Sequence, residues 1–108
     1  MEPVIEVCIV PKEMAERIAR EILEKHLAVS VDIVPGIWGL YKWQGNLESN
    51  NDDVTMLMTT DYELVEELCG LLLDRHPSKM PVIVTLTIEE LPSPYRDMIQ
   101  QQLGIESW

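Results

Sequence analysis

The chain has 108 residues, of which 46% are hydrophobic and 25% are charged, which is ordinary for a globular domain. Its 19 acidic and 8 basic residues give a net charge of −11. This balance argues against nucleic acid or an anionic membrane as a partner, because phosphate binding needs clustered Lys and Arg. The length predicts a single domain over residues 1–108.

Residues 4–10 form a β-branched run that ends at Pro11, which predicts a buried strand. Residues 12–25 carry apolar side chains at every third or fourth position, which predicts an amphipathic helix. Residues 29–33 then alternate between apolar and polar, as a strand does. His26, just after the helix, is expected to be a solvated cap.

The next segment predicts one long, bent β-hairpin. Val34-Pro35-Gly36 places a kink in the outgoing strand, because Pro removes a ladder donor and Gly marks a bend. The chain turns at Gln44-Gly45-Asn46 and returns through residues 54–60. Residues 49–53 are all polar and fit either a loop or part of the returning strand.

The second half repeats the helix–strand pattern. Thr60 and Glu63 have the spacing of a capping box, which predicts Thr60 as the N-cap of a helix that ends near His76. Cys69 falls on the apolar stripe of this helix and is expected in the core. Residues 82–88 predict a last strand, and residues 95–103 predict a short final helix.

This order predicts the α+β class, as a ferredoxin-like βαββαβ sandwich with two helices on one face of an antiparallel sheet. The first strand is apolar on both faces, with Ile5 and Val7 on one side and Cys8 and Val10 on the other. Antiparallel sheets usually present one polar face to water. The helix-free face is therefore expected to be buried by other subunits.

The chain resembles the CutA family of divalent-cation tolerance proteins from about residue 4 to residue 98. The resemblance rests on the order and spacing of several short stretches. These are Ala15-Glu16-Arg17-Ile18-Ala19-Arg20, Leu27-Ala28, Ile33-Val34-Pro35-Gly36, Tyr41-Lys42-Trp43-Gln44-Gly45, Thr59-Thr60, and His76-Pro77 followed by Pro81.

The resemblance implies a homotrimer, kinship with PII-type signalling proteins, and a link to copper tolerance. A copper site assigned in the family uses a Cys, a His and a Glu, which correspond here to Cys8, His76 and Val82. Val82 therefore stands where the family's copper site has its Glu ligand. The family also has Lys and Tyr where this chain has Met58 and Ser78, so three polar members of a cleft near the subunit boundary are changed.

Cys8 and His76 are the candidate metal ligands, because thiolate with imidazole suits copper or zinc. The alternatives are a buried structural thiol and a histidine that only ends a helix. A trimer interface is expected to include the aromatic and turn residues of the hairpin, although the aromatics could instead stack on a planar ligand. These residues are Trp38, Tyr41, Trp43, Gln44 and Gly45.

Two functions follow. The first is a homotrimer in divalent metal (copper) tolerance that acts by binding. The alternative is a PII-like signalling or protein-anchoring trimer with an unidentified partner and no physiological metal. An enzyme is not expected, because no Ser/His/Asp order or phosphate-cradling loop is present. The N-terminus has no signal-peptide pattern and no run approaches the roughly 18 apolar residues of a membrane helix, so a cytoplasmic location is expected.

Overall fold

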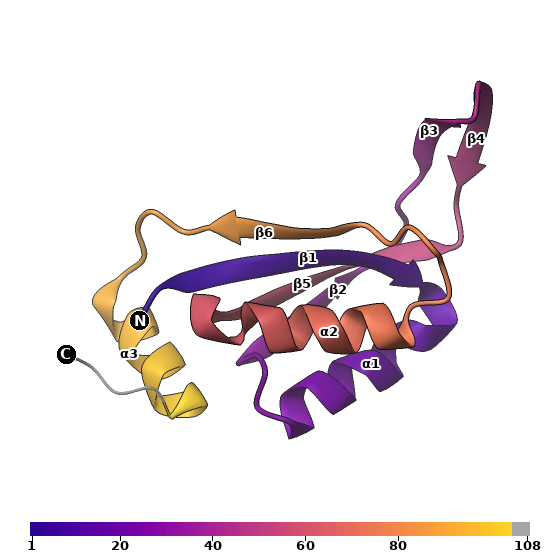
Figure 1. Ribbon diagram of the computed structural model, residues 1–108. Coiled ribbons are helices and arrows are strands. Elements are labelled where there is room, and N and C mark those ends of the chain that lie inside the picture. Colours follow the sequence, from indigo (N-terminus) through magenta and orange to yellow (C-terminus); the bar gives the residue numbers. More distant parts are fainter. Residues whose placement is uncertain (105–108) are drawn as a thin grey trace.

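The computed structural model describes residues 1–104, so residues 105–108 of the predicted domain lie outside it. Its main sheet has four antiparallel strands in the order β2-β5-β1-β6 (Figure 1). The strands are β1 (Pro3–Pro11), β2 (Ser30–Val34), β5 (Asp53–Asp61) and β6 (Ile83–Thr87). This topology confirms the predicted ferredoxin-like sandwich.

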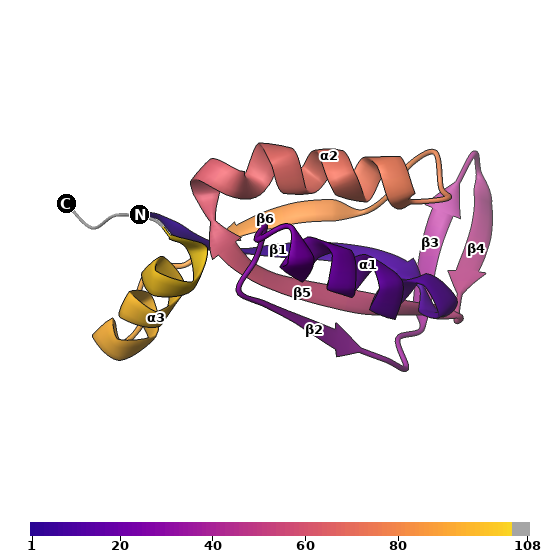
Figure 2. The same ribbon diagram turned by 90° about the horizontal axis from the view of Figure 1, so that it is seen from below.

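Helices α1 (Lys12–Glu24) and α2 (Val65–Arg75) cover one face of this sheet (Figures 1 and 2). The core lies between them and the sheet, because alternate residues of β1 and β5 point toward the helices. The buried strand residues on this side of the sheet are Val4, Glu6, Cys8, Val10, Val54, Met56, Met58 and Thr60. The helices contribute Ala15, Ile18, Ala19, Ile22, Leu68, Leu71 and Leu72.

The predicted capping box at Thr60 is wrong by one residue. Thr60 is a buried residue of β5, and its hydroxyl donates to the Leu27 carbonyl oxygen at 2.7 Å. Asp61 caps the short 3-10 turn η1 (Tyr62–Leu64) that precedes α2, because its carboxylate accepts from the Glu63 N–H at 3.0 Å. The same carboxylate accepts from the Glu2 N–H at 2.6 Å, which ties the start of the chain to this turn.

The predicted long hairpin is divided into two parts. Near the body, β2 pairs with β5, and farther out β3 (Gly39–Trp43) pairs with β4 (Asn46–Asn50) as a separate ribbon. The break follows Gly36, which has a φ of +78°. The ribbon stands away from the main sheet in Figure 1. Of the polar residues 49–53, Ser49 and Asn50 belong to β4, and the strand interruption falls at Asn51 and Asp52.

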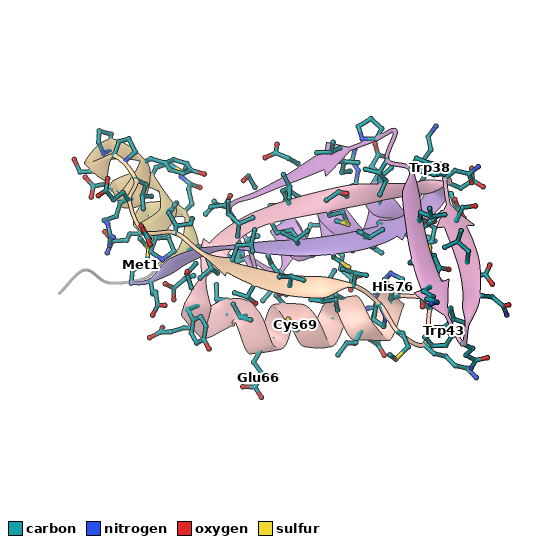
Figure 3. All side chains as sticks on the ribbon, turned by 90° about the horizontal axis from the view of Figure 1, so that it is seen from above. Met1, Trp38, Trp43, Glu66, Cys69 and His76 are labelled. Atoms are coloured by element: carbon teal, nitrogen blue, oxygen red, sulfur yellow. The ribbon has the colours of Figure 1, made fainter. Side chains whose placement is uncertain are left out.

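The face of the sheet that carries no helix is turned toward the viewer in Figure 3, and its β1–β6 half is apolar. Ile5 and Val7 of β1 lie opposite Leu86 and Val84 of β6, and Leu57 lies on the other side of Val7. Val84 and Leu86 are exposed, and the other three are partly exposed. This apolar half of the face therefore lacks cover in the single chain.

The last helix, α3 (Ser93–Leu103), lies at the end of the molecule opposite the ribbon (Figure 1). It ends at Gly104, whose φ of +69° is the usual left-handed stop. Only Ile99 of this helix is fully buried. Within residues 1–104 no helix is long and apolar enough to cross a membrane.

The two core helices are joined by an ion pair that gives a pH-dependent prediction. Arg75 donates to both oxygens of Glu21, at 3.0 and 2.7 Å, and Lys25 lies 2.9 Å from the same carboxylate. Arg75 first, and then Lys25, lower the pKa of Glu21 from 4.5 to about 2. A carboxyl group with a lowered pKa stabilises the fold above its ordinary pKa and loses that contribution as the pH falls.

Glu21→Gln should therefore lower the thermal midpoint at pH 6 and reduce its change between pH 4.5 and about 2. Thermal melts across this pH range in low salt measure the effect, which added salt should weaken. Glu24→Gln removes the same charge from the exposed face of the same helix and is the control. Identical pH profiles for the two variants would contradict the role of the pair.

Candidate functional site

A cleft of about 610 Å³ lies between the β3–β4 ribbon and the segment that joins α2 to β6. Its wall on the ribbon side is mostly aromatic and apolar, and the joining segment adds polar side chains. The lining residues are Ile9, Gly39, Leu40, Tyr41, Trp43, Asn50, Asp53, His76, Ser78, Lys79, Met80 and Val82. A volume of this size and a mixed lining are typical of small-ligand sites.

The period of β3 places two aromatic side chains at this cleft. Tyr41 and Trp43 are alternate residues of the strand and therefore share one face of the ribbon. Both line the cleft. Trp38, which precedes β3, does not line it and is strongly exposed. Gln44 and Gly45 form the tight turn at the ribbon tip, with φ values of +49° and +83°.

His76 is fixed in the cleft by main-chain hydrogen bonds at both ring nitrogens. It is the C-cap residue of α2, and the Ser78 N–H donates to its Nδ1 at 3.0 Å. Because Nδ1 accepts, the ring proton is on Nε2, which donates to the Ile9 carbonyl oxygen at 2.6 Å. A metal ion could bind His76 only if one of these two hydrogen bonds opened.

Cys8 lies on the helix side of β1 and is fully buried. Its Sγ is 3.9 Å from the Ile9 carbonyl oxygen, which is also the acceptor for His76. The fold thus brings Cys8 and His76 to the same peptide group. Burial and then the charge of Glu6 raise the pKa of Cys8 to about 11, so its thiol is protonated at neutral pH.

Val82, at the position of the expected third ligand, lines the cleft beside His76 and is about half exposed. It offers no donor atom. Among residues 1–104, no three His, Cys, Asp or Glu side chains converge closely enough to hold a metal ion.

Glu6 is a buried carboxylate in the middle of β1 that the sequence pattern did not single out. Cys69 donates its thiol proton to Oε1 of Glu6 at 3.2 Å, and the Thr85 hydroxyl donates to Oε2 at 2.7 Å. Cys69 is only partly buried, so its expected place in the core is corrected to the rim of the core above Glu6. An acidic residue inside a β-branched run was the signal that could have identified this cluster.

A family model described as "CutA1 divalent ion tolerance protein" matches residues 4–102. The divalent-cation tolerance protein CutA of Thermus thermophilus is 33% identical over 107 residues, which cover 96% of this chain and 100% of the relative. Human Protein CutA is 31% identical over 83% of this chain, and the match spans 50% of the human protein.

Solved structures agree with the sequence comparison. The CutA1 structure from Thermus thermophilus superposes with a TM-score of 0.87 at 31% identity, covering 93% of this chain and 97% of the other. A structure described as a PII-like protein CutA, from Nostoc sp. PCC 7120, has a TM-score of 0.85 at 26% identity, covering 95% and 99%. An Archaeoglobus fulgidus CutA described as periplasmic has a TM-score of 0.88 at 29% identity, covering 94% and 98%. The chain belongs to the CutA1 family of divalent ion tolerance proteins.

Proposed function

We propose that this chain acts as a homotrimer that binds a ligand and catalyses no reaction. The observation that carries the proposal is the uncovered apolar face of the main sheet, where Val84, Leu86 and Val82 are each more than 40% exposed. Contiguous apolar patches of this kind mark interaction surfaces in soluble proteins. Symmetric burial against copies of the same chain removes the patch from water.

The β3–β4 ribbon supports the same assembly. An isolated two-stranded hairpin is marginally stable in water, and this ribbon pairs with no other strand among the described residues. Leu40 and Leu47 are exposed on it in addition to the aromatic residues. We place Trp38, Tyr41, Trp43, Gln44 and Gly45 at the boundary between subunits, so that the cleft lies beside a neighbouring chain.

The ligand of the proposed trimer is a divalent metal ion, with copper as the leading candidate, and it binds at His76 in the cleft. The support is the name of the family and the convergence of Cys8 and His76 on the Ile9 carbonyl group. Binding requires His76 to release Ser78 or Ile9, and it requires the buried thiol of Cys8 to lose its proton. Both requirements lower the affinity relative to a preformed site.

Calorimetric titration of the reduced protein with Cu(II), and separately with Zn(II), tests this site. We expect saturable binding near one ion per subunit that is weakened roughly 10-fold or more in His76→Ala. The chain has only two histidines, so His26→Ala is a matched control. His26 is exposed after α1, outside the cleft, and its replacement should leave binding unchanged. Equal affinity in both variants would contradict a site at His76.

A second function is favoured by the hydrogen bonds of His76 and by the side chain of Val82. Both ring nitrogens of His76 are hydrogen-bonded to the main chain, and the neighbouring Val82 is apolar. This arrangement suits a structural role in which His76 fixes the shape of the cleft. In that case the trimer is a PII-like signalling or protein-anchoring scaffold with a protein partner. Absence of saturable metal binding to the intact trimer would favour this function.

We propose a cytoplasmic location, which is supported by two free cysteines, Cys8 and Cys69. The alternative is an exported location, because the A. fulgidus CutA is described as periplasmic. Fractionation of cells that express the full chain should recover it with cytoplasmic markers, and recovery in an exported fraction would contradict the proposal.

A further inference from the structure

The solvent face of α2 carries a glycine that the fold itself does not require. Gly70 lies in the middle of this helix, and its φ is not in the left-handed region that favours glycine. Apart from the adjoining backbone, an added Cβ atom would meet nothing within 4 Å among the described residues. Glycine is, after proline, the least favourable residue inside a helix. This exposed glycine therefore lowers the stability of α2 and gives no packing advantage within the subunit.

Gly70 borders a hollow of about 330 Å³ between α2 and the C-terminal end of α1. The base of the hollow is apolar, because Leu27 and Leu71 line it and are both buried. Its other lining residues are charged, namely Lys25, Glu67, Asp74 and Arg75. The missing side chain at position 70 thus leaves space for a side chain from another molecule to reach an apolar base.

Leu73 is an exposed apolar residue beside this hollow. It is 57% exposed and lies three residues after Gly70, which places both on the same side of the helix. Most other large apolar side chains that are more than half exposed belong to the ribbon or the cleft, namely Trp38, Leu40, Tyr41, Leu47 and Met80. Leu73 lies on the side of the sheet opposite the proposed subunit interface, so that interface does not explain its exposure.

The N-terminal half of the same segment is acidic. Glu63, Glu66 and Glu67 are exposed, and none of them forms an ion pair with another residue in the range 1–104. Figure 3 shows the Glu66 side chain pointing away from the body of the molecule. Arg75, the one basic residue of α2, is bound to Glu21 of α1. The face therefore combines unpaired negative charge with an apolar residue and an open hollow.

We propose that this face of α2 docks a basic amphipathic helix of a partner protein. An apolar side chain of the partner enters the hollow at Gly70 beside Leu73, and its Lys and Arg residues face Glu66 and Glu67. An amphipathic helix laid in a groove is a common mode of protein recognition, and complementary charge fixes its register. The proposal rests on the scaffold function proposed above, because it names the surface by which the trimer would hold its partner.

The docking face remains accessible in the proposed trimer. Helix α2 lies on the covered side of the sheet, whereas the uncovered apolar face is on the other side (Figures 1 and 3). None of residues 62–75 lines the cleft. Each subunit would present one such face, so a partner with repeated basic segments would gain affinity by binding several subunits at once.

Fluorescence anisotropy with a labelled synthetic peptide and the full chain tests the proposal. The peptide has roughly 18 residues, long enough to form a helix, with Leu at every third or fourth position and Lys or Arg elsewhere. A second peptide has the same composition in an order without this period. At physiological salt we expect the periodic peptide to bind about 10-fold more tightly than the second one.

Gly70→Gln separates docking from folding. Gln is a better helix former than Gly, so this variant should melt a few degrees higher than the wild type. The same side chain blocks the hollow and should weaken binding of the periodic peptide about 10-fold. Leu73→Gln should also weaken binding. Leu23→Gln, at a 39% exposed position on α1, is its control and should not.

Charge variants test the acidic part of the face. Replacing both Glu66 and Glu67 with Gln should weaken the periodic peptide and reduce the dependence of its affinity on salt. Replacing Glu13 and Glu24 with Gln removes the same charge from exposed positions on α1 and should leave the affinity unchanged. Equal losses in the two double variants would assign the binding to the overall charge of −11 and reject the docking face.

Two further results would overturn the docking face. The first is wild-type affinity of Gly70→Gln for the periodic peptide, and the second is equal binding of the two peptides by the wild type. Sedimentation velocity on the same samples reports on assembly separately. An intact trimer that binds neither peptide would reject the docking face alone. A monomer whose peptide binding is weakened by Gly70→Gln would support the docking face and contradict the trimer.

Discussion

Replacing Val84 with Glu is expected to break the proposed trimer into monomers without unfolding the chain. Val84 is 44% exposed in the single chain, so a polar side chain there should change subunit stability by only about 0.5 kcal/mol. In the trimer the same carboxylate would be buried against apolar residues without a partner. That costs about 3 kcal/mol or more per interface, which is about 100-fold in the association constant.

Leu73→Glu is the matched control for this variant. Leu73 is 57% exposed, but it lies on α2, on the side of the sheet opposite Val84. Sedimentation velocity of the two variants at the same micromolar concentration should give a monomer for Val84→Glu and a trimer for Leu73→Glu. Trimers in both samples would show that the uncovered face is not the interface.

Removing the Trp43 side chain is expected to produce the largest single loss of assembly energy in the ribbon. Buried aromatic anchors at the centre of an interface typically cost about 2–4 kcal/mol when truncated to Ala. Trp43 is 46% exposed in the single chain and so has area left to bury against a neighbour. Because the stability of the proposed trimer would depend on concentration, Trp43→Ala should lower the thermal midpoint most strongly in dilute samples.

Tyr62→Ala provides the comparison for Trp43→Ala. Tyr62 is an aromatic residue of similar exposure, at 55%, but it lies in the turn before α2. Thermal melts at two concentrations that differ 100-fold should separate the variants. A Trp43→Ala trimer that resists dilution as well as the wild type does would place this side chain outside the interface.

Most helices and strands could be predicted because each carries a recognisable pattern of apolar residues. The β-branched run in residues 4–10 and the apolar spacing in residues 12–25 each match one element of the structure, β1 and α1. The start of the second helix could not be placed by pattern alone, since Thr60 and Asp61 are both good N-caps. Tertiary contacts decide between the two residues. The Thr60 hydroxyl donates to the carbonyl oxygen of Leu27, and the Asp61 carboxylate accepts from the Glu2 N–H.

The hairpin, too, could be predicted only in part from the sequence. The kink at Pro35-Gly36 was predictable from backbone chemistry, and so was the turn at Gln44-Gly45. The place where the returning strand breaks was not, because residues 49–53 are uniformly polar and carry no period. Pairing decides it, since Asn50 lies opposite Gly39 while Asp53 begins the strand that pairs with β1.

The neighbourhood of Cys8 and His76 was predictable from topology, because the ends of adjacent strands fix which segments meet. The orientation of the side chains was not. Cys8 points into the helix-side core, and His76 uses both ring nitrogens in hydrogen bonds to the main chain. Glu6 was overlooked because a single acidic residue in an apolar run is usually expected to face solvent, whereas the pleat turns it toward α2.

Sedimentation equilibrium of the unmodified full chain, from micromolar down to nanomolar concentration, tests the central claim most directly. The uncovered face of the sheet and the isolated ribbon predict a single species with three times the subunit mass, dissociating only at the lowest concentrations. A folded monomer that persists at micromolar concentration would contradict the trimer, the interface assigned to the ribbon, and the proposal that the cleft binds its ligand beside a neighbouring chain.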